Sequence, residues 1–380
     1  MKNKILYLAK VDFQEKNNIG VRNKVEGQIK ALESLGYEVD IISIFNQDII
    51  FNYKTVIKTY SSITKIVDKA LMNFRFYKVI NEKIDASIYN AVYIRYPTMS
   101  QPYLLRFLKK LSKSDSAILF EIPTYPYKQE LESSIPKRII YFIDKIYTPY
   151  LKRYLKFIIT NYDQSEIYNI PAIRMGNGIH IDNNVKFKIG HSSSKTLSLI
   201  SVSSLINWHG HDRIIKGLSN YYNTGPQKEI RLNIIGEGEE MDNLMALTKK
   251  LNLNTKIKFH GFKKGEELEQ IYKECQVGIG TLGIHRKGIN TDNSLKTREY
   301  MSRGLPVIMA ARDFDIPENY PFVINCNPTD DPIDFHKILS FYENLVTEFP
   351  DYQNTIFNFA KDNLTWKSKM KHVLTHYELN

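Results

Sequence analysis

The pattern of apolar and polar positions divides the first half of the chain into short apolar runs and longer amphipathic segments. Apolar residues at positions 21, 25, 29 and 32 recur at helical spacing, and this pattern stops at Gly36, as is typical of a helix C-terminus. With apolar runs on either side, the segment predicts a strand–loop–helix–strand unit and therefore a parallel sheet. The strands of this half are predicted at 5–9, 38–44, 91–94, 117–122 and 157–160.

The second half repeats the alternation after a polar, serine-rich stretch at 185–195, which we expect to be a linker. Two consecutive series of alternating strands and helices predict an α/β protein with two doubly wound sheets and a cleft between them. The second series has predicted strands at 197–202, 230–235, 256–259, 277–280 and 306–309, and predicted helices at 212–220, 241–251, 266–275 and 295–303.

Length and composition narrow the class of protein. A chain of 380 residues favours two domains, and 43% hydrophobic with 24% charged residues exclude a disordered chain. The mean hydropathy is −0.34, and no run approaches the ~20 apolar residues of a membrane span. The apolar run near the start is short for a secretory signal, and Cys275 and Cys326 are too few for a disulfide framework. We therefore expect a cytoplasmic protein.

The positive charge is concentrated in one half of the chain. Residues 1–180 contain 27 basic and 17 acidic residues, so they carry nearly all of the net charge of +11. Nucleic acid, an anionic membrane surface and a phosphorylated lipid are the partners that fit this asymmetry. The stretches 53–83 and 133–158 mix basic and aromatic residues, which suits a membrane interface. The alternative for both stretches is a core-facing helix with a solvated lysine face.

The candidate chemistry lies after the strands of the second half, because open α/β sheets bind ligands beyond the carboxyl ends of their strands. The helix predicted from Leu295 offers backbone N–H groups and a positive dipole end to an anion. Lys296 adds a charge in its first turn, and Glu299 lies near the same face. A carboxylate can accept two hydrogen bonds from a ribose diol, so the set suits a nucleotide diphosphate. The alternative is a solvated ion pair.

Residues 295–308, LKTREYMSRGLPVI, resemble the signature of the family-four retaining glycosyltransferases, which have the GT-B fold of two facing Rossmann-like domains. The resemblance implies domains at 1–183 and 184–355, for acceptor and donor, and a helix at 356–380 packing back on the first. Further phrases resemble a branch of bacterial polysaccharide biosynthesis. The segments that carry the resemblance are 93–97, 122–127, 177–179, 208–213, 234–238, 259–262 and 284–288.

The family assigns roles to matching positions. Glu299 would hold the ribose, and Lys296 with the backbone N–H groups around it would hold the donor diphosphate. Phe262 would border the nucleobase unless it is a core residue, and Gly20 would let the backbone approach the phosphate unless it is a plain turn residue. The donor set implied by the resemblance is Gly20, Arg213, Gly236, Gly261, Phe262, Ser294, Leu295, Lys296, Thr297 and Glu299.

Two departures from the family pattern bear on catalysis. The first Glu of the family's Glu-x7-Glu motif is replaced by Thr291, which is followed by Asp292. Either residue could contact the sugar, or the change alters specificity or weakens catalysis. The family's Arg and Lys pair is also missing, with Ser204 and His209 in the corresponding places, so His209 could supply a proton or a weak charge to a phosphate. The catalytic set is then Lys296, Thr291, Asp292 and His209.

The resemblance also implies the mechanism and the absence of a metal. Retaining transfer would proceed without a dedicated base, because the donor phosphate accepts the acceptor proton. Residues 313–315 read Asp-Phe-Asp, but they follow the wrong strand for a metal motif. In the first half, Glu121 could act on an acceptor hydroxyl or form a buried salt bridge. The expected acceptor residues are Arg22, Lys24, Arg95, Glu121 and Tyr125.

These expectations describe a cytoplasmic glycosyltransferase of the hexosyltransferase class. Its donor is a nucleotide diphosphate sugar, with UDP favoured and GDP as the alternative, and it needs no further cofactor. Its acceptor is a glycan or lipid-linked glycan for capsule, O-antigen or exopolysaccharide, and its basic half contacts the inner face of the membrane. One alternative is a catalytically weakened partner subunit. A nucleic-acid-binding protein is the other, and the sequence has none of the usual recognition motifs.

Overall fold

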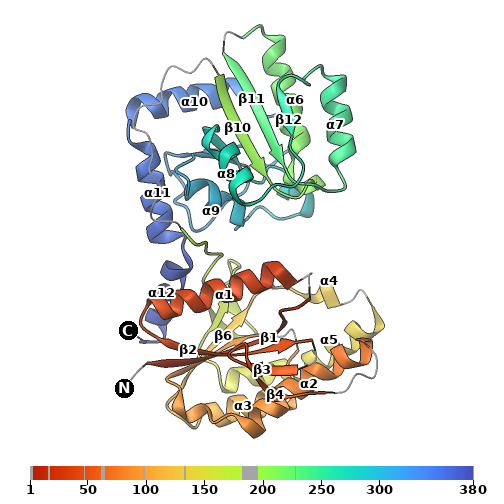
Figure 1. The fold of residues 1–380 in the computed structure, drawn as a ribbon, viewed down its shortest axis with the longest axis vertical. Helices are drawn as coiled ribbons and strands as arrows, with labels where there is room; N and C mark the ends of the chain where they lie inside the picture. Colours follow the sequence, from red (N-terminus) through yellow and green to blue (C-terminus); the bar gives the residue numbers. More distant parts are fainter. Residues whose placement is uncertain are drawn as a thin grey trace. The chain divides into compact units, whose positions relative to one another are not determined.

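The computed structural model describes residues 3–15, 18–46, 48–60, 65–96, 99–131, 134–181, 196–226 and 228–379. The predicted linker at 185–195 lies outside these residues. The chain divides into two units, one of residues 1–178 with 366–380 and one of residues 179–365. Figure 1 shows both.

The first unit is built on a mostly parallel sheet. The strand order is β4-β3-β2-β1-β5-β6-β7-β9-β8, and the pairs among β2, β1, β5, β6, β7 and β9 are parallel. The core strands are β1 (Lys4–Asp12), β2 (Glu38–Phe45), β5 (Ala91–Arg95), β6 (Ala117–Ile122), β7 (Ile158–Thr160) and β9 (Ile170–Arg174). The edges are β3 (Asp48–Phe51), β4 (Thr55–Lys58) and β8 (Glu166–Ile167), which pair antiparallel. The parallel sheet confirms the sequence prediction, whereas these edge strands were not predicted.

Alternate side chains of β1 enter two separate cores. Leu6 and Leu8 belong to the core under α2 (Lys65–Lys83), α3 (Pro102–Leu111) and α5 (Ile135–Tyr147). Ile5 and Tyr7 belong to the core under α1 (Ile19–Ser34) and α12 (Trp366–His376). Because side chains alternate along a strand, a run that is apolar throughout is buried on both faces. Two short elements, α4 (Lys128–Leu131) and the 3-10 helix η3 (Thr148–Arg153), flank α5, and another 3-10 helix, η2 (Ala86–Ile88), precedes β5.

The second unit contains a six-stranded sheet among its described residues, in the order β12-β11-β10-β13-β14-β15, with every pair parallel. This is the Rossmann order, and its topological switch point lies between β10 and β13. The strands are β10 (Thr196–Val202), β11 (Glu229–Ile235), β12 (Ile257–Phe259), β13 (Val277–Ile279), β14 (Val307–Met309) and β15 (Val323–Asn325). The helices are α6 (His211–Asn223), α7 (Met241–Lys250), α8 (Gly265–Lys273), α9 (Leu295–Met301), α10 (Phe335–Glu348) and α11 (Tyr352–Asn363).

The last part of the chain changes units at Thr365–Trp366, about ten residues later than the expected boundary at 355–356. Helix α11 stays with the second unit because Ile356 and Ala360 are buried in its core. Trp366 instead fills a space in the first unit that only glycines leave open. A Cβ at Gly27 would lie 2.5 Å from its ring, and one at Gly178 would lie 2.6 Å from its backbone nitrogen. Among the helices of the described ranges, none combines the length and apolar character needed to cross a bilayer.

Candidate active site

Two loops meet at the carboxyl ends of β10 and β13, where the switch point predicts a ligand site. The first, after β10, contains the 3-10 helix η4 (Asn207–His209), and the second contains η5 (Ile284–Lys287). The Leu282 N–H donates to the His209 carbonyl at 3.2 Å. Gly210 has a φ of +73°, and a Cβ there would lie 2.7 Å from the nitrogen of Gly283. The loops therefore approach backbone to backbone, which requires glycine.

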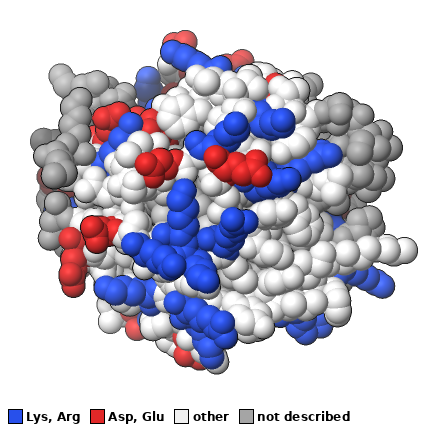
Figure 2. All heavy atoms as spheres, turned by 90° about the horizontal axis from the view of Figure 1, so that it is seen from below, with Lys and Arg blue, Asp and Glu red and all other residues white. Residues whose placement is uncertain are grey.

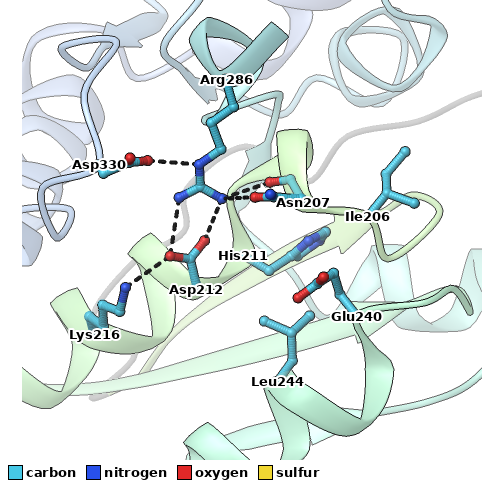
Figure 3. Close-up of a pocket in the computed structure, with 9 residues that line it drawn as sticks. All are labelled: Ile206, Asn207, His211, Asp212, Lys216, Glu240, Leu244, Arg286 and Asp330. Atoms are coloured by element: carbon cyan, nitrogen blue, oxygen red, sulfur yellow. Dashed lines mark hydrogen bonds and ion pairs between the residues drawn. The ribbon is translucent and has the colours of Figure 1, made fainter.

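Arg286 ties the two loops together, as Figure 3 shows. Its guanidinium donates to both carboxylate oxygens of Asp212, at 2.9 and 3.1 Å, and to the Asn207 carbonyl at 2.7 Å. It also pairs with Asp330 at 2.7 Å. A bidentate arginine–carboxylate pair fixes orientation as well as distance. The segments 208–213 and 284–288 carry the resemblance separately in the sequence, and in the structure Arg286 and Asp212 join them by an ion pair. A cavity of about 460 Å³ lies beside them, lined also by His211, Lys216 and Glu240.

Arg213 is placed differently from the donor contact expected of it. Its side chain is buried and donates to three backbone carbonyls: to Leu282, to Asn327 at 3.0 Å and to Asp331 at 2.8 Å. These contacts hold the loop after β13 and the loop after β15 against α6. Arg213 therefore positions the site through the backbone.

The glycines after β11 also serve close packing. Gly236 has a φ of +131°, and a Cβ there would collide with the Ser203 carbonyl, as one at Gly238 would with the Leu205 carbonyl. The structure thus places Gly236 against the loop after β10. Next to it, Gly261 adopts a φ of +65° and Phe262 is 65% exposed, so the alternative that Phe262 is a core residue is wrong. An exposed aromatic ring is available for stacking.

Helix α9 is anchored by a buried ion-pair cluster. Arg298 pairs with Asp313 at 2.6 Å and with Asp315 at 2.6 Å, and all three side chains are almost wholly buried. The two aspartates of the Asp-Phe-Asp sequence at 313–315 therefore have a structural role, because they hold Arg298 of α9. At the start of α9, Leu295 is partly exposed, whereas Thr297 is buried with its hydroxyl 3.1 Å from that of Ser294. The helix has seven residues, so the charge of Lys296 outweighs its dipole.

Lys296 is a buried cation whose ammonium has no hydrogen-bond partner among the described residues. It is 7% exposed. Burial lowers the pKa of Lys296 to about 8, partly opposed by the charge of Asp292. An unpaired buried ammonium is costly in free energy, so Lys296 is a candidate for binding an anion.

Two histidines share this electrostatic environment. Burial and the charge of Lys296 lower the pKa of His209 to about 4 and that of His211 to about 3, so both rings are neutral at pH 7. Nδ1 of His209 lies 2.6 Å from the Ser204 carbonyl, which assigns the proton to Nδ1 and leaves Nε2 as an acceptor. A neutral ring offers a phosphate no positive charge.

Glu299 lies one turn beyond Lys296, in a mixed environment. Burial raises the pKa of the Glu299 carboxyl, and the nearby Arg303 partly opposes this shift. Arg303 lies 4.1 Å from the ring centre of Tyr272 and donates to Glu269 at 3.2 Å. The Tyr272 hydroxyl is buried beside the same carboxyl and also lowers its pKa. Arg303 and Tyr272 thus both favour the ionised form of Glu299, against the effect of burial.

Thr291 and Asp292 occupy different settings. Thr291 is exposed, and its backbone forms a bridge with Arg312. Asp292 is half-buried and accepts a hydrogen bond from the Thr281 hydroxyl at the end of β13. Its charge acts on both Lys296 and His209. Of the two residues, Asp292 is the one that the structure brings to the Lys296 environment.

In the first unit, two of the expected acceptor residues are buried and paired with each other. Arg95 donates to Glu121 at 2.5 Å, and their side chains are 8% and 0% exposed. Tyr93 donates to the same carboxylate at 2.9 Å, and Gln28 donates to it at 3.4 Å. Of the two alternatives that the sequence offered for Glu121, the structure has the buried salt bridge. We therefore do not carry either residue forward as an acceptor contact.

The other expected residues of this unit remain accessible in part. Arg22 is exposed and pairs with Glu26 at 2.7 Å along α1. Gly20 lies in the first turn of α1, where a Cβ would meet no described atom within 4 Å. Lys24 is half-buried on the same helix, and Tyr125 packs edge-on against Tyr168. The structure thus brings three of these residues together on one helix.

Sequence reasoning passed over His211, Tyr272 and Thr281. His211 lies within the segment 208–213 that carries the resemblance, but the expected contact with a phosphate was assigned to His209. Thr281 lies two residues after the end of β13 and could have been found by its position beyond the strand. Nothing in the sequence indicated Tyr272, because a tyrosine near the end of an amphipathic helix is usually a core residue. Within the described ranges, no group of three His, Cys, Asp or Glu side chains is arranged to hold a metal.

Residues 182–318 match the family described as glycosyl transferases group 1. A search of curated proteins finds no match. Among solved structures, a glycosyltransferase from Rickettsia africae is similar over 99% of this chain and 98% of its own, with a TM-score of 0.62 and 14% identity. Anabaena HepE in complex with UDP is similar over 99% of both chains, with a TM-score of 0.59 and 14% identity.

The lipopolysaccharide outer core galactosyltransferase WaaB is similar over 98% of this chain and 99% of its own, with a TM-score of 0.54 and 12% identity. This structural likeness shows the fold: the protein has the GT-B fold, which these glycosyltransferases share. The match over 182–318 adds that its second unit carries a group 1 glycosyl transferase domain. The protein is thus a glycosyltransferase.

Proposed function

We propose that the protein is a retaining glycosyltransferase that takes a sugar from a nucleotide diphosphate donor, with UDP favoured and GDP as the alternative. The single observation that carries this proposal is the buried, unpaired ammonium of Lys296 beyond the sheet's switch point. A group 1 domain match over the same residues supports it.

Lys296 supplies the charge that a leaving diphosphate needs. A buried ammonium held at a pKa of about 8 is still protonated at pH 7, and the low local dielectric strengthens its attraction for phosphate oxygens. Arg213 and Arg286 are fully engaged with carbonyls and carboxylates, so they hold the loops and leave the anion to Lys296. The N–H groups at the start of α9 add weaker donors.

The nucleoside end of the donor fits the neighbouring groups. Glu299 can accept two hydrogen bonds from the ribose hydroxyls, and the exposed ring of Phe262 beside Gly261 can stack on a base. UDP is favoured because the structure of HepE, similar over its whole length, is a complex with UDP. The proposal needs no further cofactor.

The chemistry follows from what these residues can and cannot do. The acceptor oxygen forms a bond to the anomeric carbon while the bond from that carbon to the diphosphate breaks on the same face. The acceptor proton passes to a phosphate oxygen of the leaving group. Neutral His209, with Nε2 as an acceptor, can bind a sugar hydroxyl, and Asp292 can contact the sugar where Thr291 lacks a carboxylate. The protein contributes orientation and charge stabilisation.

We further propose a glycan or lipid-linked acceptor of bacterial surface polysaccharide, such as capsule, O-antigen or exopolysaccharide. The likeness to an outer core galactosyltransferase supports this class of acceptor. The positive charge of residues 1–180 supports work at the inner face of the cell membrane, where anionic lipid gathers. Arg22 and Lys24 on α1 and Tyr125 are the acceptor-side residues we retain, and Gly20 on the same helix stays in the donor set.

One observation favours a second function, that of a catalytically weakened partner subunit. Thr291 stands exposed where the resemblance places a carboxylate, and its backbone rather than its hydroxyl is engaged. Such a subunit would bind the nucleotide through Lys296 without turning over a donor sugar.

Thermal unfolding with UDP, GDP and their sugar conjugates tests the proposal. A ligand at 100 times its Kd stabilises a protein by about 2.7 kcal/mol. We expect one nucleotide to give this shift, and we expect Lys296→Met and Glu299→Gln to abolish or sharply reduce it. Lys249→Met, an exposed lysine of α7, is the matched control and should keep the full shift.

The outcomes separate the alternatives. No shift with any nucleotide would contradict the donor site. A shift without release of UDP or GDP from any sugar conjugate, over a panel of glycan and lipid-linked acceptors, would favour the partner subunit. Turnover that is lost in Asp292→Asn while the thermal shift persists would support the enzyme.

A further inference from the structure

Helix α5 exposes a ridge of large apolar side chains. Ile135, Ile139, Phe142 and Ile146, here called the α5 ridge, are each between 47% and 74% exposed. At 100° per residue these positions fall within about 60° of one another around the helix. Tyr150, in η3 directly after α5, is also exposed. Single exposed apolar residues are ordinary, but a continuous row marks an interaction surface.

The opposite side of α5 packs against the core of the first unit, where Ile140 and Tyr141 are partly buried and Asp144 is the buried polar residue. Asp144 stands about 180° from Ile135 and is 2% exposed. Its carboxylate accepts hydrogen bonds from the hydroxyls of Tyr127, at 2.6 Å, and Tyr96, and from the N–H of Ser100 at 2.7 Å.

These bonds fix the rotation of α5. Turning the helix to bury the α5 ridge would remove Asp144 from its donors and leave a buried carboxylate or several hydroxyls unsatisfied. Asp144 also accepts from the Thr148 hydroxyl at 3.0 Å, one turn later. The exposed row is therefore a property of the folded first unit.

Basic side chains lie beside the α5 ridge and beyond its end. Arg138 and Lys145 lie to one side of it around the helix, and Lys152 and Arg153 follow in η3; all four are exposed. Figure 2 shows Lys and Arg side chains gathered beside an uncharged area on the face that it draws. A second copy of this basic unit would be repelled, whereas an anionic surface would be attracted.

We propose that the α5 ridge inserts into the interface of an anionic lipid bilayer, with the neighbouring Lys and Arg side chains at the lipid headgroups. Apolar residues backed by basic ones are the combination that binds such interfaces. This inference rests on the proposed function for its purpose, because it brings the first unit to a lipid-linked acceptor. Its physical basis, the geometry of α5, is independent of the donor site.

Flotation with vesicles tests the α5 ridge directly. The full chain is mixed with vesicles of phosphatidylcholine alone or with 30% phosphatidylglycerol, and the partition coefficient is measured. We expect binding to the anionic vesicles only, and at least a tenfold loss in Ile139→Ser with Phe142→Ser. The control Ile88→Ser changes an apolar residue that is 60% exposed in the same unit and should bind normally. Equal binding of the ridge variant and the full chain would overturn the proposal.

Charge is tested with a matched pair of variants. Lys145→Gln with Lys152→Gln should weaken binding by between about 5-fold and 30-fold, because each charge near the surface contributes about 1 kcal/mol. Lys249→Gln with Lys250→Gln makes the same change of net charge on α7 and should have little effect. Equal loss in both pairs would show attraction by net charge alone and would contradict a site at α5.

A spectroscopic reporter covers the case in which the double serine variant does not fold. Phe142→Trp should show a blue-shifted emission with anionic vesicles and quenching by brominated lipid. An unchanged emission, or a dimer that Ile139→Ser dissociates, would assign the α5 ridge to a protein contact and overturn the proposal. The UDP thermal shift is measured on the same samples, so loss of donor binding and loss of membrane binding are seen separately.

Discussion

The two units treat their buried charges in opposite ways. In the first unit, Arg95 and Glu121 are paired with each other and joined by Tyr93 and Gln28. In the second unit, Lys296 is buried without a partner among the described residues, beside neutral histidines. Arg95 and Glu121 lie at the carboxyl ends of β5 and β6, and Lys296 lies after β13, so both sets could be proposed as site residues from the sequence. We therefore take the missing partner, more than burial or position, as the ground for proposing Lys296 as a binding group and Glu121 as a structural one.

The largest effect is expected from breaking the closed network of the first unit. Glu121→Ala leaves Arg95 buried and uncompensated, which costs about 3–5 kcal/mol of unfolding free energy. Chemical denaturation would measure the loss, and Glu82→Ala, at an exposed position of α2, should change stability by less than about 0.5 kcal/mol.

The double variant Glu121→Leu with Arg95→Leu tests whether the lost stability comes from the uncompensated charge of Arg95. Removing both charges takes away the uncompensated group, so the double variant should recover much of the stability lost in Glu121→Ala. If Glu121→Ala is as stable as the full chain and instead loses activity, the carboxylate acts on an acceptor, and the comparison of the two units fails.

In the second unit, removing a buried charge is expected to increase the free energy of unfolding, whereas in the first unit it is expected to decrease it. Lys296→Met should raise the free energy of unfolding at pH 7 by on the order of 1–3 kcal/mol, because it removes a buried cation. The folded pKa of about 8 lies below the ordinary 10.5, so the unfolded chain binds more protons between these values. The penalty is complete below pH 8 and disappears as the pH rises towards 10.5.

Denaturation at pH 7 and pH 10 measures this prediction as a difference between the two proteins. The stabilising effect of Lys296→Met should shrink at pH 10. With saturating UDP at pH 7 the order should reverse, because the ligand stabilises only the chain that has Lys296. A variant that is less stable than the full chain at pH 7 without ligand would mean that Lys296 has a structural partner.

The fold was predictable where the pattern is strong. The buried parallel strands are apolar on both faces, so their runs stand out along the sequence. The hairpin of β3 and β4 was not predicted, because Asn46, Asn52 and Tyr53 take left-handed conformations at its turns without any glycine to mark them. The change of unit at Trp366 depends on the space beside Gly27 and Gly178, which no local pattern contains.

The sequence predicted which residues of the candidate site lie near one another, but it did not predict which of them are buried or paired. Helical spacing places Lys296 and Glu299 on one turn, but the buried ion pairs that anchor their helix join Arg298 to Asp313 and Asp315, which no helical spacing indicates. Arg95 and Glu121 are register partners on β5 and β6, so their pairing follows from a strand alignment that the sequence does not state.

The smallest effect is expected at Gly20, the one donor-set residue that lies in the first unit. A Cβ there meets no described atom within 4 Å and the residue is helical, so Gly20→Ala should stabilise the first unit by about 0.5–1 kcal/mol. If the backbone at Gly20 also approaches the donor phosphate, the same variant should weaken the UDP thermal shift. A gain in stability with an unchanged shift would make Gly20 a plain helix residue and leave the donor to the second unit alone. A gain in stability with a reduced shift would show that the first unit contributes backbone to the bound nucleotide.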